Sequence, residues 1–131
     1  ADTRCGGVRD AELACWRDAL GDGAIHFRPL GYRDSGMMGT EPNDRPDVFW
    51  QADLDEATRR LVAIVREARP AVMISYDPNG NYGHPDHIMA HRVASAAAEA
   101  AAYPAYVDGH PWLSAKFYWT ATPKYLLRPW L

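Results

Sequence analysis

A strand, a polar loop and a helix follow one another between residues 71 and 102, and this unit constrains the fold more than any other part of the chain. The run Ala-Val-Met-Ile-Ser at 71–75 is typical of a short buried strand. Residues 76–87 are rich in turn formers and carry two imidazoles, two carboxylates and two phenols. Pro85 suits the first turn of a helix that runs to about residue 102. Open α/β sheets place ligand and catalytic groups in loops of this kind, so we expect a functional site here.

The rest of the chain predicts an alternation of helices and strands. Such an order implies parallel strands joined by crossovers, and therefore a layered α/β fold. The pattern predicts helices at 8–20, 53–69 and 85–102, strands at 24–30, 71–76 and 115–120, and a long loop at 31–50. Loops of that length are often functional.

Composition excludes several classes of protein. The chain has 131 residues, which suits one domain, and its net charge of −3 leaves no basic footprint for nucleic acid. No apolar run approaches the roughly 20 residues of a membrane helix, so we expect no membrane partner. The chain begins at Ala1 without an initiator Met. Cys5 and Cys15 allow a disulfide without implying one, and we expect a reduced, cytoplasmic protein.

The loop at 76–87 holds the main candidates for chemistry. If a helix begins at Pro85, His84 sits at its cap while His87 and His91 share one face. Neutral imidazole is a common metal ligand, although a third ligand would have to come from elsewhere unless all three histidines bind one metal.

The neighbouring side chains of this loop offer supporting roles. Asp86 could orient an imidazole, and Tyr82 or a protonated His84 could donate a hydrogen bond to a developing oxyanion. The alternative interpretation is that Asp86 merely caps the helix and the histidines are solvated.

A second candidate site lies at 31–37, after the expected strand at 24–30 and so at the same sheet edge. Arg33 offers a planar fork of donors for a phosphate, a carboxylate or a sugar diol. Asp34 could accept from sugar hydroxyls or hold Arg33 in place. The alternative is an ordinary Asp-Ser-Gly turn with a surface arginine.

Three segments together carry a family resemblance. Gly-Tyr-Arg-Asp-Ser-Gly-Met at 31–37, Tyr-Asp-Pro-Asn-Gly-Asn-Tyr-Gly-His-Pro-Asp-His at 76–87 and Lys-Phe-Tyr-Trp at 116–119 closely resemble the zinc-dependent sugar N-deacetylases of the LmbE-like (PIG-L) family. The resemblance runs from about residue 8 to about 120. It is strongest with the actinobacterial branch of mycothiol metabolism, and it implies a Rossmann-like three-layer α/β/α fold with a mostly parallel sheet.

The resemblance also implies roles for individual residues. His87 would be a zinc ligand, and Asp86 would support the site. His84 would stabilise the tetrahedral intermediate and protonate the leaving amine, while Tyr82 would polarise the amide carbonyl. Arg33 would hold the inositol end of the substrate, an N-acetylglucosaminyl-inositol type of amino sugar.

One family motif does not occur among the 131 residues. Family members begin with a strand and Ala-His-Pro-Asp-Asp-Glu, which supplies the other zinc ligands and the carboxylate base. We therefore expect residues 1–131 to form one N-terminally truncated domain that lacks the first strand. Zinc, or iron, would bind weakly or not at all, and a homo-oligomer or companion fragment would cover the exposed sheet. Besides the deacetylase, the resemblance leaves open a mycothiol S-conjugate amidase and an inactive fragment or non-catalytic sugar-binding remnant.

Overall fold

The computed structural model describes residues 11–15, 18–19 and 25–121. The first two segments are helical, in agreement with the helix expected at 8–20, whose remaining residues lie outside the described ones. Pairing of Cys5 with Cys15 also lies outside them, because Cys5 does. The assignment of all 131 residues to a single domain stays a prediction. No helix among the described residues has the length and apolar character needed to span a membrane.

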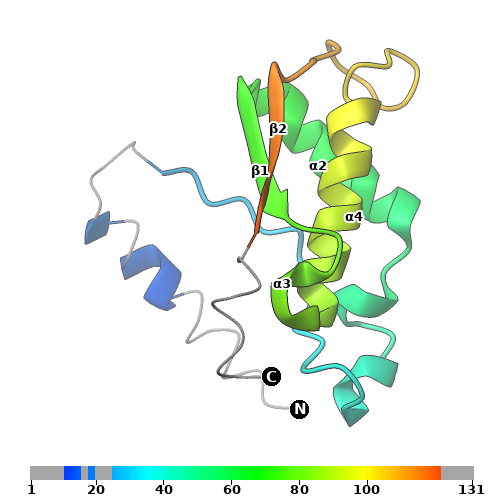
Figure 1. The fold of residues 1–131 in the computed structure, drawn as a ribbon. Coiled ribbons are helices and arrows are strands. Elements are labelled where there is room, and N and C mark those ends of the chain that lie inside the picture. The colour runs from blue at the N-terminus through cyan, green and yellow to red at the C-terminus, as the bar shows by residue number, and fades with distance from the viewer. Residues whose placement is uncertain (1–10, 16–17, 20–24, 122–131) are drawn as a thin grey trace.

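Helices and parallel strands alternate along the described chain (Figure 1). The elements are the 3-10 helices η1 (Glu41–Asp44) and η2 (Phe49–Gln51), the helices α2 (Leu54–Ala68), α3 (Gly80–Gly83) and α4 (Pro85–Ala100), and the strands β1 (Val72–Tyr76) and β2 (Lys116–Thr120). The two strands pair in parallel, with Val72 opposite Lys116 and Tyr76 opposite Thr120. The predicted α/β class is therefore confirmed, and α2, α4, β1 and β2 lie within two residues of their expected bounds.

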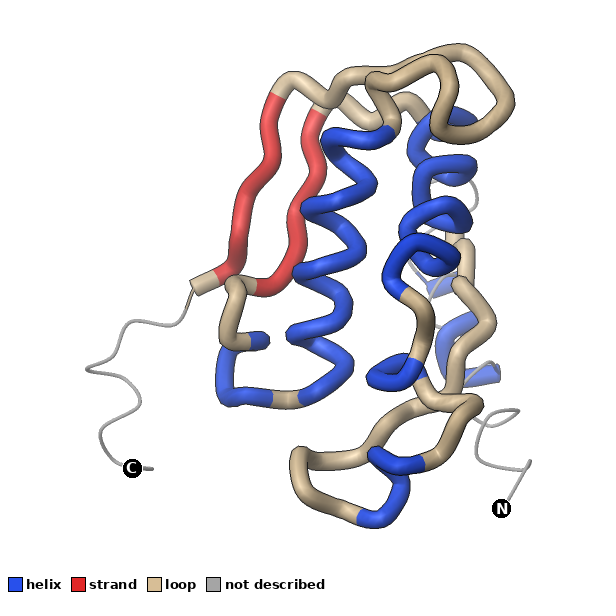
Figure 2. Tube along the Cα trace, turned by 90° about the vertical axis from the view of Figure 1, so that its right-hand side faces the viewer, coloured by secondary structure: helices blue, strands red, loops and turns tan. Residues whose placement is uncertain are grey.

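α4 packs against β1, and α2 packs against α4 on the side away from the sheet (Figure 2). Small side chains such as Ala97 allow the two helices to approach closely. The buried residues that line their contact are Ala57, Val62 and Val65 of α2 with Met89, Val93, Ala97 and the following Ala101. This contact forms the core of the described residues, and it fixes the position of α4 along the sheet.

The described residues cover only one face of the sheet with helices. α2 and α4 lie on the same side of β1 and β2 in both views (Figures 1 and 2). On the opposite face, Ile74 is 68% exposed and its partner Tyr118 is 48% exposed. The described chain thus contains the sheet and one helical layer of the expected three, as in an incomplete Rossmann-like fold.

The prediction of a strand at 24–30 is wrong for the residues that the structure describes. Residues 25–30 form no strand, and the pairing in this region is an isolated bridge between Arg33 and Val48. The apolar side chains of this alternating segment do not pack into the core, since Phe27 is 46% exposed. Pro29 also removes one of the amide donors that a strand would use.

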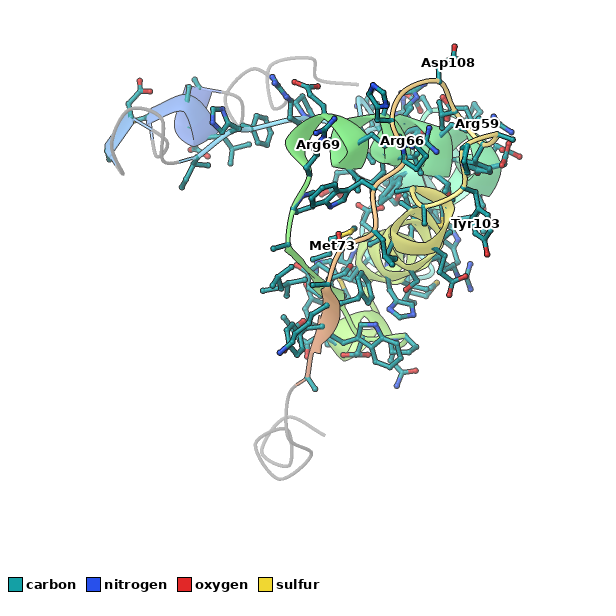
Figure 3. All side chains as sticks on the ribbon, turned by 90° about the horizontal axis from the view of Figure 1, so that it is seen from above. Arg59, Arg66, Arg69, Met73, Tyr103 and Asp108 are labelled. Atoms are coloured by element: carbon teal, nitrogen blue, oxygen red, sulfur yellow. The ribbon has the colours of Figure 1, made fainter. Side chains whose placement is uncertain are left out.

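Arg66 of α2 holds the end of α4 and the loop that follows it. Its side chain is buried, and it donates from Nε to the carbonyl of Ala101 at 3.2 Å and from Nη2 to the carbonyl of Tyr103. Nη1 donates to the carbonyls of Val107 and Gly109. Figure 3 shows Arg66 beside the loop that carries Tyr103 and Asp108. The guanidinium therefore joins the end of α4 to the loop that follows it through hydrogen bonds to four backbone carbonyls.

We expect Arg66→Met to lower the free energy of unfolding by about 2–4 kcal/mol, because it removes the hydrogen bonds by which one buried guanidinium holds the carbonyls of Ala101, Tyr103, Val107 and Gly109. Urea denaturation followed by far-UV circular dichroism measures this. The matched control is Arg28→Met, which removes an exposed ion pair with Glu67 and should cost less than about 1 kcal/mol. Equal losses in the two variants would contradict this account of Arg66.

Candidate active site at the start of α4

The loop between β1 and α4 folds back on itself and brings four polar side chains together. The carboxylate of Asp77 accepts hydrogen bonds from the amides of Asn79 at 2.8 Å and Asn81 at 3.2 Å. The short helix α3 follows, and α4 begins at Pro85 as expected, with His84 as its cap. Tyr82, His84, Asp86 and His87 consequently lie at one end of the sheet, where Figure 1 shows α3 next to the start of α4.

His84 caps α4 through its ring. Nδ1 of His84 accepts a hydrogen bond from the amide of Asp86 at 3.1 Å. An amide can only donate, so Nδ1 carries no proton, and the proton of the neutral ring is on Nε2. His84 is thereby held as a hydrogen-bond donor toward whatever faces Nε2. The alternative in which Asp86 is the cap is wrong.

His87 is held in the opposite tautomer. Its Nδ1 lies 3.3 Å from the carbonyl oxygen of Gly80, which can only accept, so Nδ1 carries the proton and Nε2 keeps its lone pair. A carbonyl partner on one ring nitrogen is the usual way in which proteins orient a metal-binding histidine. The ring is also sandwiched between Tyr76, with centroids 4.0 Å apart and 4° between the planes, and His84 at 4.7 Å. His87 thus fits the ligand role that the family resemblance implies.

Gly80 allows this contact because nothing larger fits at its position. A Cβ placed there would lie 2.7 Å from the amide nitrogen of Ile88 and 2.9 Å from Cβ of His87. The backbone conformation also has φ of +61°, which disfavours other residues. The carbonyl that orients His87 therefore depends on a glycine.

Tyr82 stands at the edge of the two imidazoles. Its ring makes edge contacts with His87 at 5.2 Å and with His84 at 6.1 Å between centroids, and its side chain is 58% exposed. The phenol belongs to the same cluster as the proton on Nε2 of His84.

His91 lies one turn further along α4 and is directed at the sheet. Its Nδ1 is 2.8 Å from the carbonyl oxygen of Tyr76, and its ring meets the edge of Trp119 at 5.0 Å. Among the described residues, the ligand atoms that converge within 4.8 Å of one another belong to Asp34, His84 and Asp86. The three histidines of this segment therefore do not form a ligand set, which removes that alternative.

The group of Asp34, His84 and Asp86 could hold a metal ion. The Nε2 atom of His84, however, carries the proton as long as Nδ1 accepts from the amide of Asp86. Ligation through Nε2 would require the other tautomer and the loss of the helix cap. The hydrogen bonds thus favour His87 over His84 as the metal-binding imidazole.

Ser35 is the residue of this site that the sequence did not reveal. It is fully buried, and it donates to both carboxylate oxygens of Asp86, from its amide at 3.0 Å and from Oγ at 2.5 Å. Oγ in turn accepts from the amide of Trp50 at 2.8 Å, and the carbonyl of Ser35 accepts from Asn43. A single buried serine in an Asp-Ser-Gly turn has no periodic signal that could have identified it.

The loop at 31–37 does lie beside the histidine loop, although no strand at 24–30 brings it there. The guanidinium of Arg33 is half-exposed and pairs with Asp47 at 3.4 Å. Oδ1 of Asp34 accepts from the amide of Gly36 at 2.8 Å. The neighbouring Arg45, more than Arg33, holds the pKa of the Asp47 carboxyl below its ordinary value.

Contacts with α2 fix the start of this loop. The hydroxyl of Tyr32 donates to Glu56, its ring stacks on Phe49 at 5.1 Å, and the guanidinium of Arg60 lies 4.8 Å from its centroid. Burial, followed by the hydrogen bond to Glu56, raises the pKa of Tyr32 to about 12. Tyr32 therefore remains a neutral donor throughout the physiological pH range.

Residues 1–98 match the family described as PIG-L: GlcNAc-PI de-N-acetylase. The match covers most of the chain, and the chain belongs to this family. The family that the sequence motifs resembled is thereby confirmed.

The chain is similar to several actinobacterial proteins that carry the name 1D-myo-inositol 2-acetamido-2-deoxy-alpha-D-glucopyranoside deacetylase. It is 55% identical over 127 residues to that of Geodermatophilus obscurus, covering 94% of this chain and 43% of the relative. It is 60% identical over 129 residues to that of Streptomyces scabiei, covering 94% and 39%. The chain thus spans about two fifths of the length of these relatives. A solved structure of a conserved protein from Thermus thermophilus is 28% identical, with a TM-score of 0.49 over 54% of this chain and 32% of that one.

We expect Ser35→Ala to lower the free energy of unfolding by about 1–3 kcal/mol, because Asp86 and the amide of Trp50 each lose a buried partner. Chemical denaturation measures the change. The matched control is Ser95→Ala on α4, which removes a buried hydroxyl that has no hydrogen-bond partner among the described residues. That variant should be as stable as the parent or slightly more stable. A loss at position 95 as large as at position 35 would contradict the role given to Ser35.

Proposed function

We propose that the protein hydrolyses the N-acetyl group of an amino sugar joined to inositol, releasing acetate and the free amine, as a step of mycothiol biosynthesis. The observation that carries the proposal is the pairing of two ring nitrogens in one loop: Nδ1 of His84 faces an amide donor, and Nδ1 of His87 faces a carbonyl acceptor. Membership of the de-N-acetylase family and the names of the similar actinobacterial proteins support this choice of substrate.

In this proposal two donors act on the acetyl carbonyl. Nε2–H of His84 and the hydroxyl of Tyr82 donate hydrogen bonds to the carbonyl oxygen, and they stabilise the negative charge that develops when water attacks. The C–N bond then breaks, and the leaving amine takes up a proton. His84 can deliver that proton as an imidazolium, in which both ring nitrogens carry a proton. Nδ1 could then no longer accept from the amide of Asp86. Proton delivery and the helix cap therefore compete for Nδ1.

Asp86 and the loop at 31–37 position the other reactants. Ser35 holds both oxygens of Asp86 so that the carboxylate lies within 4.8 Å of the His84 ring. The guanidinium of Arg33 and the carboxylate of Asp34 bind hydroxyls of the substrate, with Arg33 at the inositol end. Both side chains are accessible to solvent, as such contacts require.

His87 is the metal ligand of this proposal through Nε2, and zinc is the metal, although iron suits the same ligand. Bound zinc supplies Lewis acidity that lowers the pKa of a water molecule to about 7. The remaining ligands and the carboxylate base belong, by family resemblance, to the Ala-His-Pro-Asp-Asp-Glu motif, which is not among these 131 residues. The activity assays proposed below therefore use full-length protein, meaning protein that includes this motif.

We expect the full-length protein to release acetate from N-acetylglucosaminyl-inositol and to act at least about 100-fold more slowly on a bimane conjugate of mycothiol. Product amine is measured by fluorescent labelling. Turnover of the conjugate alone would reject the deacetylase in favour of the amidase. No turnover of either substrate by metal-loaded protein would reject both activities.

We expect His87→Asn to abolish stoichiometric zinc in the full-length protein, as measured by plasma emission spectrometry after dialysis. His91→Asn is the matched control, because its amide can still donate to the carbonyl of Tyr76 where Nδ1 of His91 now lies at 2.8 Å. It should retain zinc. Loss of zinc in His91→Asn with retention in His87→Asn would overturn the ligand assignment.

A further inference from the structure

Asn81 has a backbone conformation that residues with a side chain rarely adopt. Its φ is 64° and its ψ is −89°, close to the γ-turn that is rare and strained. Asn81 and Arg69 are the two non-glycine residues with positive φ in the described part of the chain, and Arg69 lies at the end of α2. Strain of this kind persists only where the surrounding structure imposes it.

Contacts on the N-terminal side of Asn81 impose this conformation. The carboxylate of Asp77 accepts from the amides of Asn79 and Asn81, and its carbonyl accepts from the amide of Gly80 at 2.9 Å. Gly80 is pressed against the first turn of α4, where its carbonyl faces His87. These contacts therefore hold the backbone that precedes Asn81.

On the C-terminal side the chain must reach the cap of α4 within three residues. His84 is held there by its hydrogen bond with the amide of Asp86. Tyr82 lies between these two fixed points; it is 58% exposed, and its ring makes T-shaped contacts with the imidazoles of His84 and His87. Packing alone does not hold an exposed ring, so its direction depends on the backbone that precedes it.

We propose that Asn81 is a positioning residue, whose strained backbone directs the Tyr82 phenol at the oxygen that His84 also faces. The inference rests on the proposed function for its catalytic consequence, but the placement of the ring can be tested separately. Glycine at position 81 would adopt the same angles without strain and many others besides. It should therefore release the ring while leaving the fold intact.

The experiment compares Asn81→Gly with Asn79→Gly in the full-length protein. Asn79 lies in the same turn with relaxed angles of −87° and −2°, so the second variant adds flexibility without relieving strain. We expect Asn81→Gly to lower kcat by about 10- to 100-fold, as a misplaced catalytic group does, with little change in KM. Its melting temperature should be unchanged or higher, and Asn79→Gly should retain kcat.

Two further readouts separate positioning from a general structural effect. In a Tyr82→Phe background, Asn81→Gly should lower kcat by less than about two-fold, because it acts through the phenol that is already gone. Carbon-13 relaxation of the labelled Tyr82 ring should show a restricted ring in the parent and a mobile one in Asn81→Gly, whether or not the protein deacetylates the chosen sugar. Equal ring order in both proteins, or additive losses of kcat, would overturn the inference. If the Tyr82 ring of the parent protein is mobile, the inference is rejected. If the parent protein also lacks deacetylase activity, the proposed function is rejected with it.

Discussion

The amide of Asp86 donates to Nδ1 of His84, and the carbonyl of Gly80 accepts from Nδ1 of His87, so that one stretch of backbone determines where the protons of two imidazoles lie. Both contacts require that α4 begin at Pro85, which has no amide proton of its own and a φ suited to the first helical turn. The protonation of each ring determines what its Nε2 atom can do. The chemistry of the site therefore depends on the position at which the helix begins.

The packing of the helices and strands determines that position and brings the second loop to it. α4 is held between β1 and α2 along its length, and Arg66 of α2 holds the carbonyls beyond its C-terminal end. At the N-terminal end, Ser35 reaches Asp86 from 51 residues away in the sequence. Tyr32 and its contacts with α2 hold the loop from which Ser35 projects. The candidate site thus joins two loops to one rigid helix, a suitable support for groups whose placement matters.

The sequence predicted those parts of the molecule that follow from local patterns. The apolar run before Tyr76, the proline at 85 and the apolar stripe of α2 each identified an element correctly. Residues 24–30 have the alternation of apolar and polar residues that is typical of a strand. A strand also needs a neighbouring strand to pair with, and residues 25–30 pair with none among the described residues. The tautomers and the role of Ser35 could not be predicted, because they arise from backbone groups that meet only in the folded chain.

The most direct test of the account is the tautomeric state of the two imidazoles in metal-free protein. Nitrogen-15 correlation spectra of histidine-labelled protein above about pH 8, where imidazoles are neutral, report which ring nitrogen carries the proton. The signals can be assigned with His84→Gln and His87→Gln variants. The account predicts the proton on Nε2 of His84 and on Nδ1 of His87. The same tautomer at both positions would contradict it.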